Sequence, residues 1–160
     1  MKITQRLFKT SDAQVVVDLI ARTMRVSNRK DYSAAYIERD IHERDAAFFV
    51  AQAKQTHFYV FFDGAKIIAT GAIGSYWGSQ TEFSLFSIFV DPQYQGQGVG
   101  RFVIQTLEQD PYFLKAKRVE IPASITGLPF YQKMGYQFKD GVDQVDEEQL
   151  YRLEKFTKSN

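Results

Sequence analysis

Residues 87–104 read Ser-Ile-Phe-Val-Asp-Pro-Gln-Tyr-Gln-Gly-Gln-Gly-Val-Gly-Arg-Phe-Val-Ile, and they are the most informative stretch of this chain. An apolar run ends at Val90, a turn follows, and Gly96, Gly98 and Gly100 alternate before an amphipathic run begins. Glycine lacks a Cβ atom, so the backbone of such a loop can approach a ligand closely. The unpaired N–H groups and the positive dipole end of the following helix point into the same loop. The stretch therefore predicts a strand, a glycine loop and a helix start that together bind phosphate or pyrophosphate.

Three kinds of phosphate-binding loop contain glycines in this way, and their fixed positions separate them. A Walker loop closes with Lys and then Ser or Thr, whereas Arg101 and Phe102 follow Gly100 here. A dinucleotide loop needs G-x-G-x-x-G at the start of a repeated βαβ unit, and this loop has G-x-G-x-G in mid-chain. An acyl-coenzyme A loop follows Gln/Arg-x-x-Gly-x-Gly/Ala, which residues 95–100 match at every fixed position. The acyl-coenzyme A loop is therefore the interpretation that fits, although a plain glycine-rich turn is the alternative.

A second segment supports this interpretation. Residues 127–136, Gly-Leu-Pro-Phe-Tyr-Gln-Lys-Met-Gly-Tyr, follow the short apolar run 118–122. Together with the glycine loop they resemble the GNAT superfamily of N-acetyltransferases. In that family a strand ending in Val-x-Pro precedes the loop, and a later helix carries Phe-Tyr-x-Lys-x-Gly-Phe/Tyr. The resemblance extends from Phe83 to Phe138, and before Phe83 it rests only on the order of the elements.

The resemblance implies an α/β (α+β) fold with a single domain over residues 1–160. The expected sheet is mixed, mostly antiparallel and of about six to seven strands, with helices on both faces. The strands 82–90 and 119–122 are expected to run parallel and to diverge at their C-terminal ends, because the helix 99–108 crosses over between them.

Hydrophobic periodicity and turn residues predict the remaining elements. Asp63-Gly64 is typical of a hairpin turn, and Pro111 is expected to end the helix that begins at Val99. Further strands are expected at 2–8, 57–62, 67–73, from 136 and at 148–156, and further helices at 15–24, at 33–41 with an extension through Asp45, and at 128–134.

Composition limits the class of protein. Hydrophobic residues make up 44% and charged residues 24%, which is ordinary for a soluble globular protein. The net charge of +1 favours neither nucleic acid nor a membrane surface as a partner, and no apolar run is long enough to cross a bilayer. The lack of cysteine excludes disulfides, and His42 and His57 show no metal-ligand spacing. A cytoplasmic monomer or homodimer without a metal is the expectation.

The resemblance also implies which residues hold acetyl-coenzyme A. Backbone N–H groups of the loop should bind the pyrophosphate, and Arg101 either adds a charged contact or is simply exposed. A bulge in the strand before the loop should free N–H groups that bind the pantetheine arm and polarise the thioester carbonyl. Ser124, where many members have Asn, is expected to bond a coenzyme amide, and Lys133 to lie near a coenzyme phosphate. The expected set is Ile88, Phe89, Val90, Gln95, Gly96, Gln97, Gly98, Val99, Gly100, Arg101, Ser124 and Lys133.

Tyr131 occupies the place of the tyrosine that the family uses as a general acid. A phenol has a pKa near 10 and a thiol near 8.5, so a neutral tyrosine can protonate a departing thiolate at pH 7. The alternative for Tyr131 is simple packing at a helix edge.

The general base is less clearly marked in the sequence. A primary amine with a pKa near 10 must lose a proton before it attacks, and some relatives use a Glu on the central strand for this. Here that position holds Ser84, whereas Glu82 lies two residues earlier and on the same face of the strand. Glu82, directly or through water, is the candidate base, and a water chain or another group is the alternative.

The predicted function is transfer of an acetyl group to a primary amine of a small molecule or peptide. A catalytically inactive coenzyme A sensor of the same fold is the alternative, and a domain that binds a different nucleotide is a third. Tyr131 favours the enzyme, and Ser84 in place of an acid favours the sensor. Acceptor choice is expected to come from residues 24–36 and the Tyr76-Trp77 loop. The first region is basic, as in a solvated helix face or in a site for a carboxylate-bearing amine: Arg22, Arg25, Arg29 and Lys30.

Overall fold

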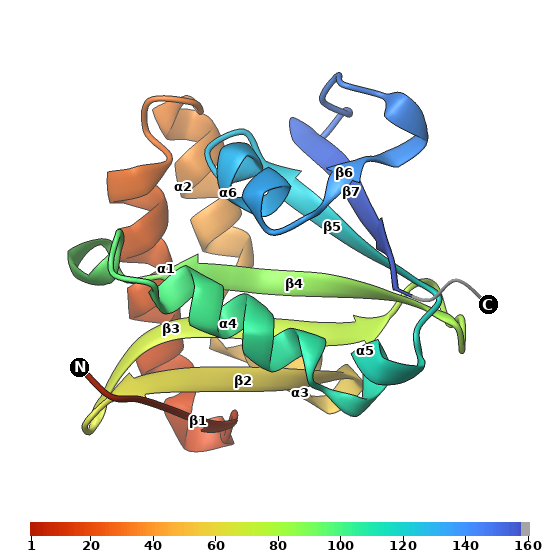
Figure 1. Ribbon diagram of the computed structural model, residues 1–160. Helices are drawn as coiled ribbons and strands as arrows, with labels where there is room; N and C mark the ends of the chain where they lie inside the picture. The colour runs from red at the N-terminus through yellow and green to blue at the C-terminus, as the bar shows by residue number, and fades with distance from the viewer. Residues whose placement is uncertain (158–160) are drawn as a thin grey trace. The chain divides into compact units, whose positions relative to one another are not determined.

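The computed structural model describes residues 1–157, and seven strands among them form one mixed sheet in the order β1-β2-β3-β4-β5-β7-β6 (Figure 1). The chain divides into two compact units. Unit 1 comprises Met1–Ala72 and Ser87–Val103, and unit 2 comprises Ile73–Phe86 and the chain from Ile104 onward. The strands are β1 (Ile3–Leu7), β2 (Thr56–Asp63), β3 (Lys66–Ser75), β4 (Glu82–Val90), β5 (Arg118–Ser124), β6 (Gln137–Phe138) and β7 (Leu150–Phe156). The helices are α1 (Ala13–Ser27), α2 (Ala34–Glu43), α3 (Ala46–Gln55), α4 (Val99–Glu108), α5 (Pro111–Lys115) and α6 (Leu128–Lys133).

Strand pairing confirms the predicted fold class. β4 runs parallel to β5, with Glu82–Ser84 in register with Arg118–Glu120. Parallel strands need a crossover connection, which α4 and α5 supply here. β1 pairs antiparallel with β2, and β7 pairs antiparallel with both β5 and β6. Within unit 2 the pairing stops at Ser84 although β4 and β5 both continue, as predicted for strands that diverge.

Helices cover both faces of the sheet in unit 1, as predicted. Successive side chains of a strand point to opposite faces, so Phe58 and Phe61 of β2 face opposite sides. The Phe58 ring lies 5.9 Å from the ring of Phe49 in α3, whereas the Phe61 ring lies 6.0 Å from that of Phe102 in α4. Phe49, Phe58 and Phe61 are all fully buried, so each face of β2 contributes to a core.

Unit 2 has one apolar and one charged sheet face. In β5, the buried residues Ile121 and Ala123 alternate with Arg118 and Glu120, so the two kinds of side chain lie on opposite faces. Leu153 of β7 is paired with Ile121 and is also fully buried, which continues the apolar face onto the next strand. The charged face carries an ion-pair network that is described with the site.

Helix α3 corrects the sequence-based expectation, which had no helix at residues 46–55 and extended the preceding one through Asp45. In the structure α2 ends at Glu43, and the Asp45 carboxylate accepts a hydrogen bond from the Phe48 N–H at 2.9 Å, capping α3. The apolar residues of α3 are adjacent along the chain instead of three or four apart. Periodicity therefore gave no signal, and the Asp cap was the only local indication of a helix start.

The structure confirms the predicted hairpin turn at Asp63-Gly64 in full and the predicted helix end at Pro111 in part. The hairpin at Asp63-Gly64 is confirmed, since Gly64 has φ 60° between β2 and β3. α4 ends before Pro111 as predicted, but Pro111 also begins the short helix α5. Asp110 caps that helix by accepting a hydrogen bond from the Tyr112 N–H at 2.8 Å. Proline is favoured at a first helical position because its missing N–H would have no helical partner there.

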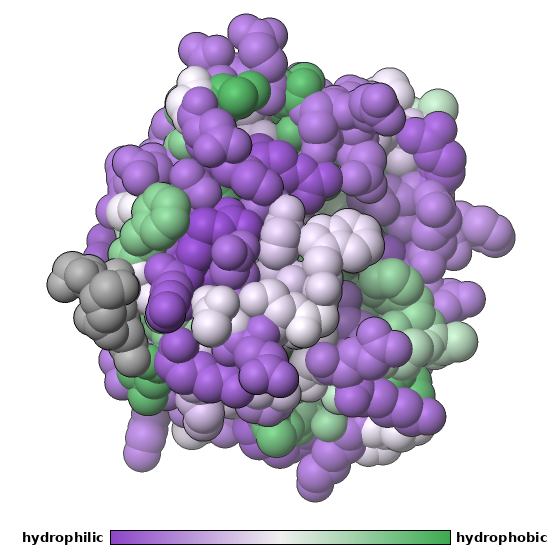
Figure 2. Space-filling view, turned by 90° about the vertical axis from the view of Figure 1, so that its right-hand side faces the viewer, coloured by the Kyte–Doolittle hydropathy of each residue, from purple (hydrophilic) through white to green (hydrophobic). Residues whose placement is uncertain are grey.

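The face of the molecule in Figure 2 is largely polar. Hydrophilic residues predominate on the face in Figure 2, and hydrophobic residues lie there in small separate groups. None of the helices in residues 1–157 has the length and apolar character needed to cross a bilayer. The same residues contain no group of three or more His, Cys, Asp or Glu side chains that could hold a metal ion.

Candidate functional site

The glycine loop begins at a buried aspartate. Asp91 follows the last residue of β4, and its carboxylate accepts a hydrogen bond from the Gln93 N–H at 2.9 Å. Its Oδ2 lies 2.7 Å from Nη2 of Arg22 in α1 and 3.9 Å from Nζ of Lys66 in β3. Burial alone raises the pKa of Asp91, but the Gln93 hydrogen bond and the Arg22 ion pair outweigh it and leave that pKa below its usual value. The charged carboxylate therefore anchors the 3₁₀ turn Pro92–Tyr94 at the entrance to the loop.

Two glycines of the loop adopt a backbone conformation that other residues avoid. Gly96 has φ 77° and Gly98 has φ 84°, where a side chain would be strained. A Cβ atom on either residue would meet no atom within 4 Å, so open space lies beside the loop backbone. Direct binding of a phosphate to the main chain requires such a space.

The side chain of Gln95 holds the loop in place. Its Nε2 donates hydrogen bonds to Oγ of Ser27 at 2.8 Å and to the carbonyl oxygen of Val90 at 3.0 Å. Ser27 is the last residue of α1 and Val90 the last of β4, so one amide ties the loop to both elements. Nε2 of Gln97 donates to the carbonyl oxygen of Gln93 at 3.0 Å. The sequence assigned both glutamines to the coenzyme, and their part in positioning the loop became apparent only from these contacts.

The start of α4 presents free backbone donors. The first helical bond joins the Phe102 N–H to the carbonyl oxygen of Gly98 at 3.1 Å. The N–H groups of Val99, Gly100 and Arg101 have no acceptor among residues 1–157. The Arg101 side chain is exposed and has no ion pair in the same range. Free N–H groups at the positive end of a helix suit a negatively charged ligand.

β4 is distorted just before the loop, where the family resemblance places a bulge. Ser87 has φ 49°, which regular strands do not contain and which occurs in β-bulges. Two hydrogen bonds hold this residue: Oγ1 of Thr70 donates to its carbonyl oxygen at 2.7 Å, and its own Oγ donates to Oε1 of Gln52 at 2.9 Å. The following residues Ile88–Val90 are half-buried, so the strand keeps partial exposure up to the loop.

Tyr131 lies in unit 2 on α6 and has a buried ring. The residue is 8% exposed, and a Cβ atom on Gly127 would come within 2.9 Å of Cε2 of the ring, so Gly127 leaves the room that the ring occupies. The hydroxyl makes no hydrogen bond within residues 1–157, yet no buried side-chain oxygen or nitrogen there is without a partner. The hydroxyl must therefore retain contact with solvent. Burial raises the pKa of Tyr131 above its usual value, which keeps the phenol neutral at pH 7.

Comparison with known proteins identifies the family. The profile described as "Acetyltransferase (GNAT) domain" matches residues 23–150, a span that includes the glycine loop and α6. The chain belongs to the GNAT acetyltransferase family. Acetyl-coenzyme A is the donor that GNAT domains use, so the cofactor expected from the sequence agrees with the family.

Solved structures confirm the GNAT fold. The PaiA N-acetyltransferase from Thermoplasma acidophilum, in complex with coenzyme A, has a TM-score of 0.84 and 17% identity over 98% of this chain and 99% of that one. A GCN5-related N-acetyltransferase from Rhodopseudomonas palustris has a TM-score of 0.80 and 19% identity over 98% and 96%. Ard1 from Thermoplasma volcanium has a TM-score of 0.72 and 15% identity over 99% and 100%. A comparison with curated proteins finds no match.

Glu82 of this GNAT domain is part of an ion-pair network. Its Oε1 accepts hydrogen bonds from Nε of Arg118 at 3.1 Å and from Nη2 at 2.9 Å. Nη1 of Arg118 donates to Oε1 of Glu120 and to Oε1 of Glu154, each at 3.0 Å. Ser84 is buried, and its Oγ donates to the carbonyl oxygen of Leu85 at 3.4 Å. No sequence pattern indicated this network, and the role of Glu82 as a base stays a prediction.

The other two expected residues of unit 2 have different surroundings. Oγ of Ser124 accepts a hydrogen bond from the Gly127 N–H at 2.9 Å, so this hydroxyl shapes the turn that precedes α6. Lys133, at the end of α6, is exposed and has no partner within residues 1–157. The ammonium group of Lys133 is available to an anionic ligand. The Ser124 hydroxyl can still donate its hydrogen to a ligand.

The end of α6 is held by Lys155 and Glu108, which sequence analysis of this GNAT domain did not single out, and by Tyr136, the last residue of the second motif. Nζ of Lys155 donates to the carbonyl oxygen of Met134 at 2.8 Å and to Oε2 of Glu108 at 2.7 Å. The same Glu108 oxygen accepts a hydrogen bond from the Tyr136 hydroxyl at 2.9 Å. The Tyr136 N–H donates to the carbonyl oxygen of Tyr131 at 3.1 Å. These contacts connect the backbone of Tyr131 to β7 and to the end of α4.

Proposed function

We propose that this chain, as a single domain over residues 1–160, transfers the acetyl group of acetyl-coenzyme A to a primary amine of a small molecule or peptide. Residues 158–160 lie outside the described residues. The observation that carries the proposal is the start of α4 in a chain of the GNAT family. Three successive N–H groups there lack acceptors within residues 1–157 and lie beside an open glycine backbone. The coenzyme A complex of the similar PaiA protein supports the same donor.

The donor is held mainly by backbone groups in this proposal. The N–H groups of Val99, Gly100 and Arg101 bind the pyrophosphate, which the positive end of the helix favours. N–H groups of Ile88–Val90, beyond the distorted Ser87, bind the pantetheine arm and polarise the thioester carbonyl. Lys133 and Ser124 add side-chain contacts to the coenzyme. Because backbone N–H groups make most of these contacts, few positions of the motif require a particular side chain.

Tyr131 serves as the general acid. As the amine attacks the carbonyl carbon, the thioester C–S bond breaks and its electron pair leaves on sulfur. The neutral phenol donates its proton to that thiolate and recovers it from solvent afterwards. Because burial favours the neutral form of Tyr131, the acid is in its active protonation state at pH 7.

The amine must lose a proton to a base before or during attack. Glu82 is the proposed acceptor of that proton, directly or through water. Both hydrogen bonds from Arg118 go to Oε1, which leaves Oε2 of Glu82 unbonded within residues 1–157. The second candidate function, a coenzyme A sensor without catalysis, is favoured by the buried Ser84 at the position where some relatives carry the acid.

Thioester turnover over a panel of primary amines tests the proposal. An acetyltransferase releases free coenzyme A at a rate that depends on the amine and forms one acetylated amine for each thiol. A sensor binds acetyl-coenzyme A but releases no thiol above the rate without protein. Failure to bind either acetyl-coenzyme A or coenzyme A in calorimetry would exclude both functions and would leave a plain turn or a site for a different nucleotide as the role of the loop.

A further inference from the structure

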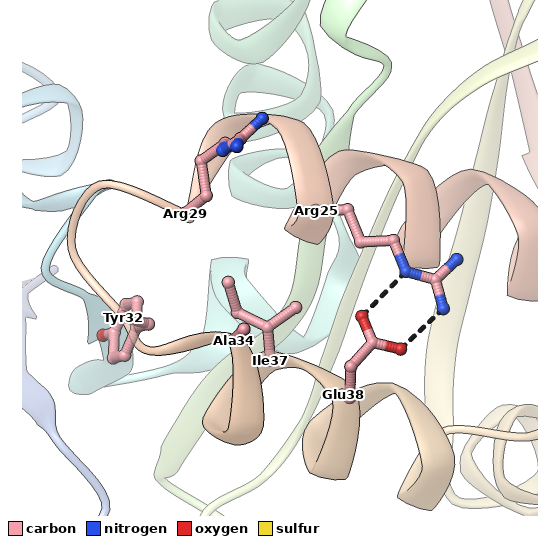
Figure 3. A pocket seen from close by; sticks show the side chains of 6 residues that line it. All are labelled: Arg25, Arg29, Tyr32, Ala34, Ile37 and Glu38. Atoms are coloured by element: carbon pink, nitrogen blue, oxygen red, sulfur yellow. Dashed lines mark hydrogen bonds and ion pairs between the residues drawn. The ribbon is translucent and has the colours of Figure 1, made fainter.

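A pocket of about 370 Å³ lies between the end of α1 and the start of α2 in unit 1. Pockets of this size commonly hold small molecules. Figure 3 shows the side chains around it, with Arg29 on one side, Tyr32 on another, and the Arg25–Glu38 pair opposite Tyr32. The lining consists of Arg25, Arg29, Tyr32, Ala34, Ile37 and Glu38.

Part of the pocket is apolar and held rigidly. Tyr32 and Ile37 are buried, and Ala34 lies beside Ile37 in Figure 3. The Tyr32 ring stacks on Tyr36 with 4.6 Å between ring centroids, which restricts its orientation. An apolar group can therefore fill this part of the pocket without reordering it.

The charges around the pocket are unbalanced. Nε and Nη2 of Arg25 donate to the two carboxylate oxygens of Glu38 at 2.9 and 2.7 Å, which neutralises both side chains. Arg29 is exposed and has no ion pair or hydrogen bond within residues 1–157. The lining therefore has one positive charge that lacks a partner in the described part of the chain. A guanidinium group binds carboxylates strongly because its N–H groups match both oxygens.

The pocket is connected to the glycine loop within unit 1. Ser27 lies between Arg25 and Arg29 in the sequence, and its Oγ accepts the 2.8 Å hydrogen bond from Gln95 of the loop. Arg22, one turn earlier on α1, pairs with Asp91 at the loop entrance. The end of α1 therefore links the pocket directly to the loop that is proposed to hold the donor.

We propose that this pocket binds the carboxylate of the acceptor, so that the enzyme acetylates small amines that carry a carboxylate and an apolar side chain, the class of apolar amino acids. This inference rests on the proposed function. Arg29 binds the carboxylate, and Tyr32, Ala34 and Ile37 contact the apolar part. Glu38 limits the affinity of the pocket for anions, because Arg25 donates its hydrogen bonds to Glu38 instead of to a ligand. Both side chains of this pair are exposed, so the pair contributes little to the stability of the fold.

Kinetics on matched acceptors test the role of Arg29. Each of L-alanine, L-leucine and L-phenylalanine is compared with its own amide, which keeps the amine and removes the negative charge. Arg29→Gln should raise KM for the amino acids about tenfold or more and leave KM for the amides unchanged, because only the charged hydrogen bond is lost. Glu38→Gln should lower KM for the amino acids because it frees Arg25. Lys30→Gln, the same charge change on an exposed neighbour outside the lining, should have no effect.

Direct binding separates this inference from the proposed function. L-phenylalanine and coenzyme A are titrated by calorimetry into the wild type and Arg29→Gln. The wild type is also titrated with the amide of L-phenylalanine. If the wild type binds coenzyme A but either fails to bind L-phenylalanine or binds the amide equally well, the carboxylate site is wrong while the donor assignment stands. Weaker coenzyme A binding in Arg29→Gln would also overturn it, because the pocket would then bind a coenzyme phosphate. If the wild type does not bind coenzyme A, the proposed function itself fails.

Discussion

Tyr131 combines a buried ring with a hydroxyl that has no protein partner within residues 1–157. Tyr131→Phe removes only that hydroxyl, so the fold and coenzyme A affinity should be retained. Single-turnover acetyl transfer should slow by about 10²–10⁴-fold, the usual effect of losing a general acid. The loss should appear in kcat because the proton is needed in the transition state. Single-turnover measurement is required because product release can hide the chemical step.

A second tyrosine provides the control for that experiment. Tyr59→Phe deletes a hydroxyl from β2 and should leave the single-turnover rate unchanged. A Tyr131→Phe variant with the rate of the wild type on a confirmed acceptor would remove Tyr131 from the mechanism.

Gly98 and Gly78 allow backbone strain to be separated from ligand binding. Gly98 has φ 84° and Gly78 has φ 79°, and a Cβ atom on either meets nothing within 4 Å. Valine at either position should therefore lower the free energy of unfolding by a similar amount, about 1–2 kcal/mol, which is the cost of placing a residue with a side chain in the left-handed backbone conformation. Only Gly98→Val should lose coenzyme A binding in calorimetry, because its side chain fills the space beside the loop backbone. Normal coenzyme A affinity in Gly98→Val would show that the loop assignment is wrong.

At the scale of elements, Lys155 connects β7 to the end of α6. Lys155→Met removes its hydrogen bonds to Met134 and Glu108, and we expect a loss of about 1–3 kcal/mol in the free energy of unfolding. kcat should fall as well, because the backbone of Tyr131 is held through the same contacts. Lys133 of α6 is exposed and has no partner among the described residues, so Lys133→Met is the control for stability alone and should change it little. Equal stability of the two variants in urea would contradict this role.

Asp91 follows the end of β4 and contacts side chains of α1 and β3, and its charge should make the free energy of unfolding depend on pH. The pKa of Asp91 in the folded protein is below the ordinary value near 3.9. The contribution of Asp91 to the free energy of unfolding is therefore complete at pH values above about 3.9 and is lost as the pH falls through the folded pKa. Asp91→Asn keeps the shape of the side chain and removes its charge. The variant should be about 1–3 kcal/mol less stable than the wild type at pH 7. Denaturant melts should show this difference shrinking below about pH 4, and a constant difference down to pH 2 would refute the assignment.

At the scale of the whole molecule, the donor should stabilise the folded chain. A ligand that binds only the native state raises the free energy of unfolding by about 2.7 kcal/mol at 100 times its Kd. We expect acetyl-coenzyme A to raise the melting temperature and ATP and NAD to have no effect at equal concentration. Equal stabilisation by ATP would instead favour the third class, a domain that binds a different nucleotide.

Much of the architecture was predictable because its signals are local. The 82–90 strand and the 99–108 helix have the predicted bounds, since an apolar run, a glycine loop and amphipathic spacing mark their ends. α3 was missed because adjacent apolar residues carry no helical period, and α5 because proline was taken only as a stop. The candidate donor loop and the candidate acid Tyr131 were predicted from short motifs, which are contiguous in the chain.

The amino-acid sequence on its own determined the family, the succession of the strands and the residues of the two motifs, because each depends on neighbours within a few positions. The tertiary structure alone decided which side chains meet. Gln95 bonds Ser27 across 68 residues, Arg118 bonds Glu82 across 36, and Lys155 bonds Glu108 across 47. A glutamine, an arginine or a lysine has many possible partners, and only the packing of distant elements selects one. For the same reason Arg29, which has no partner within residues 1–157, and its pocket became apparent only when α1 and α2 were seen side by side (Figure 3).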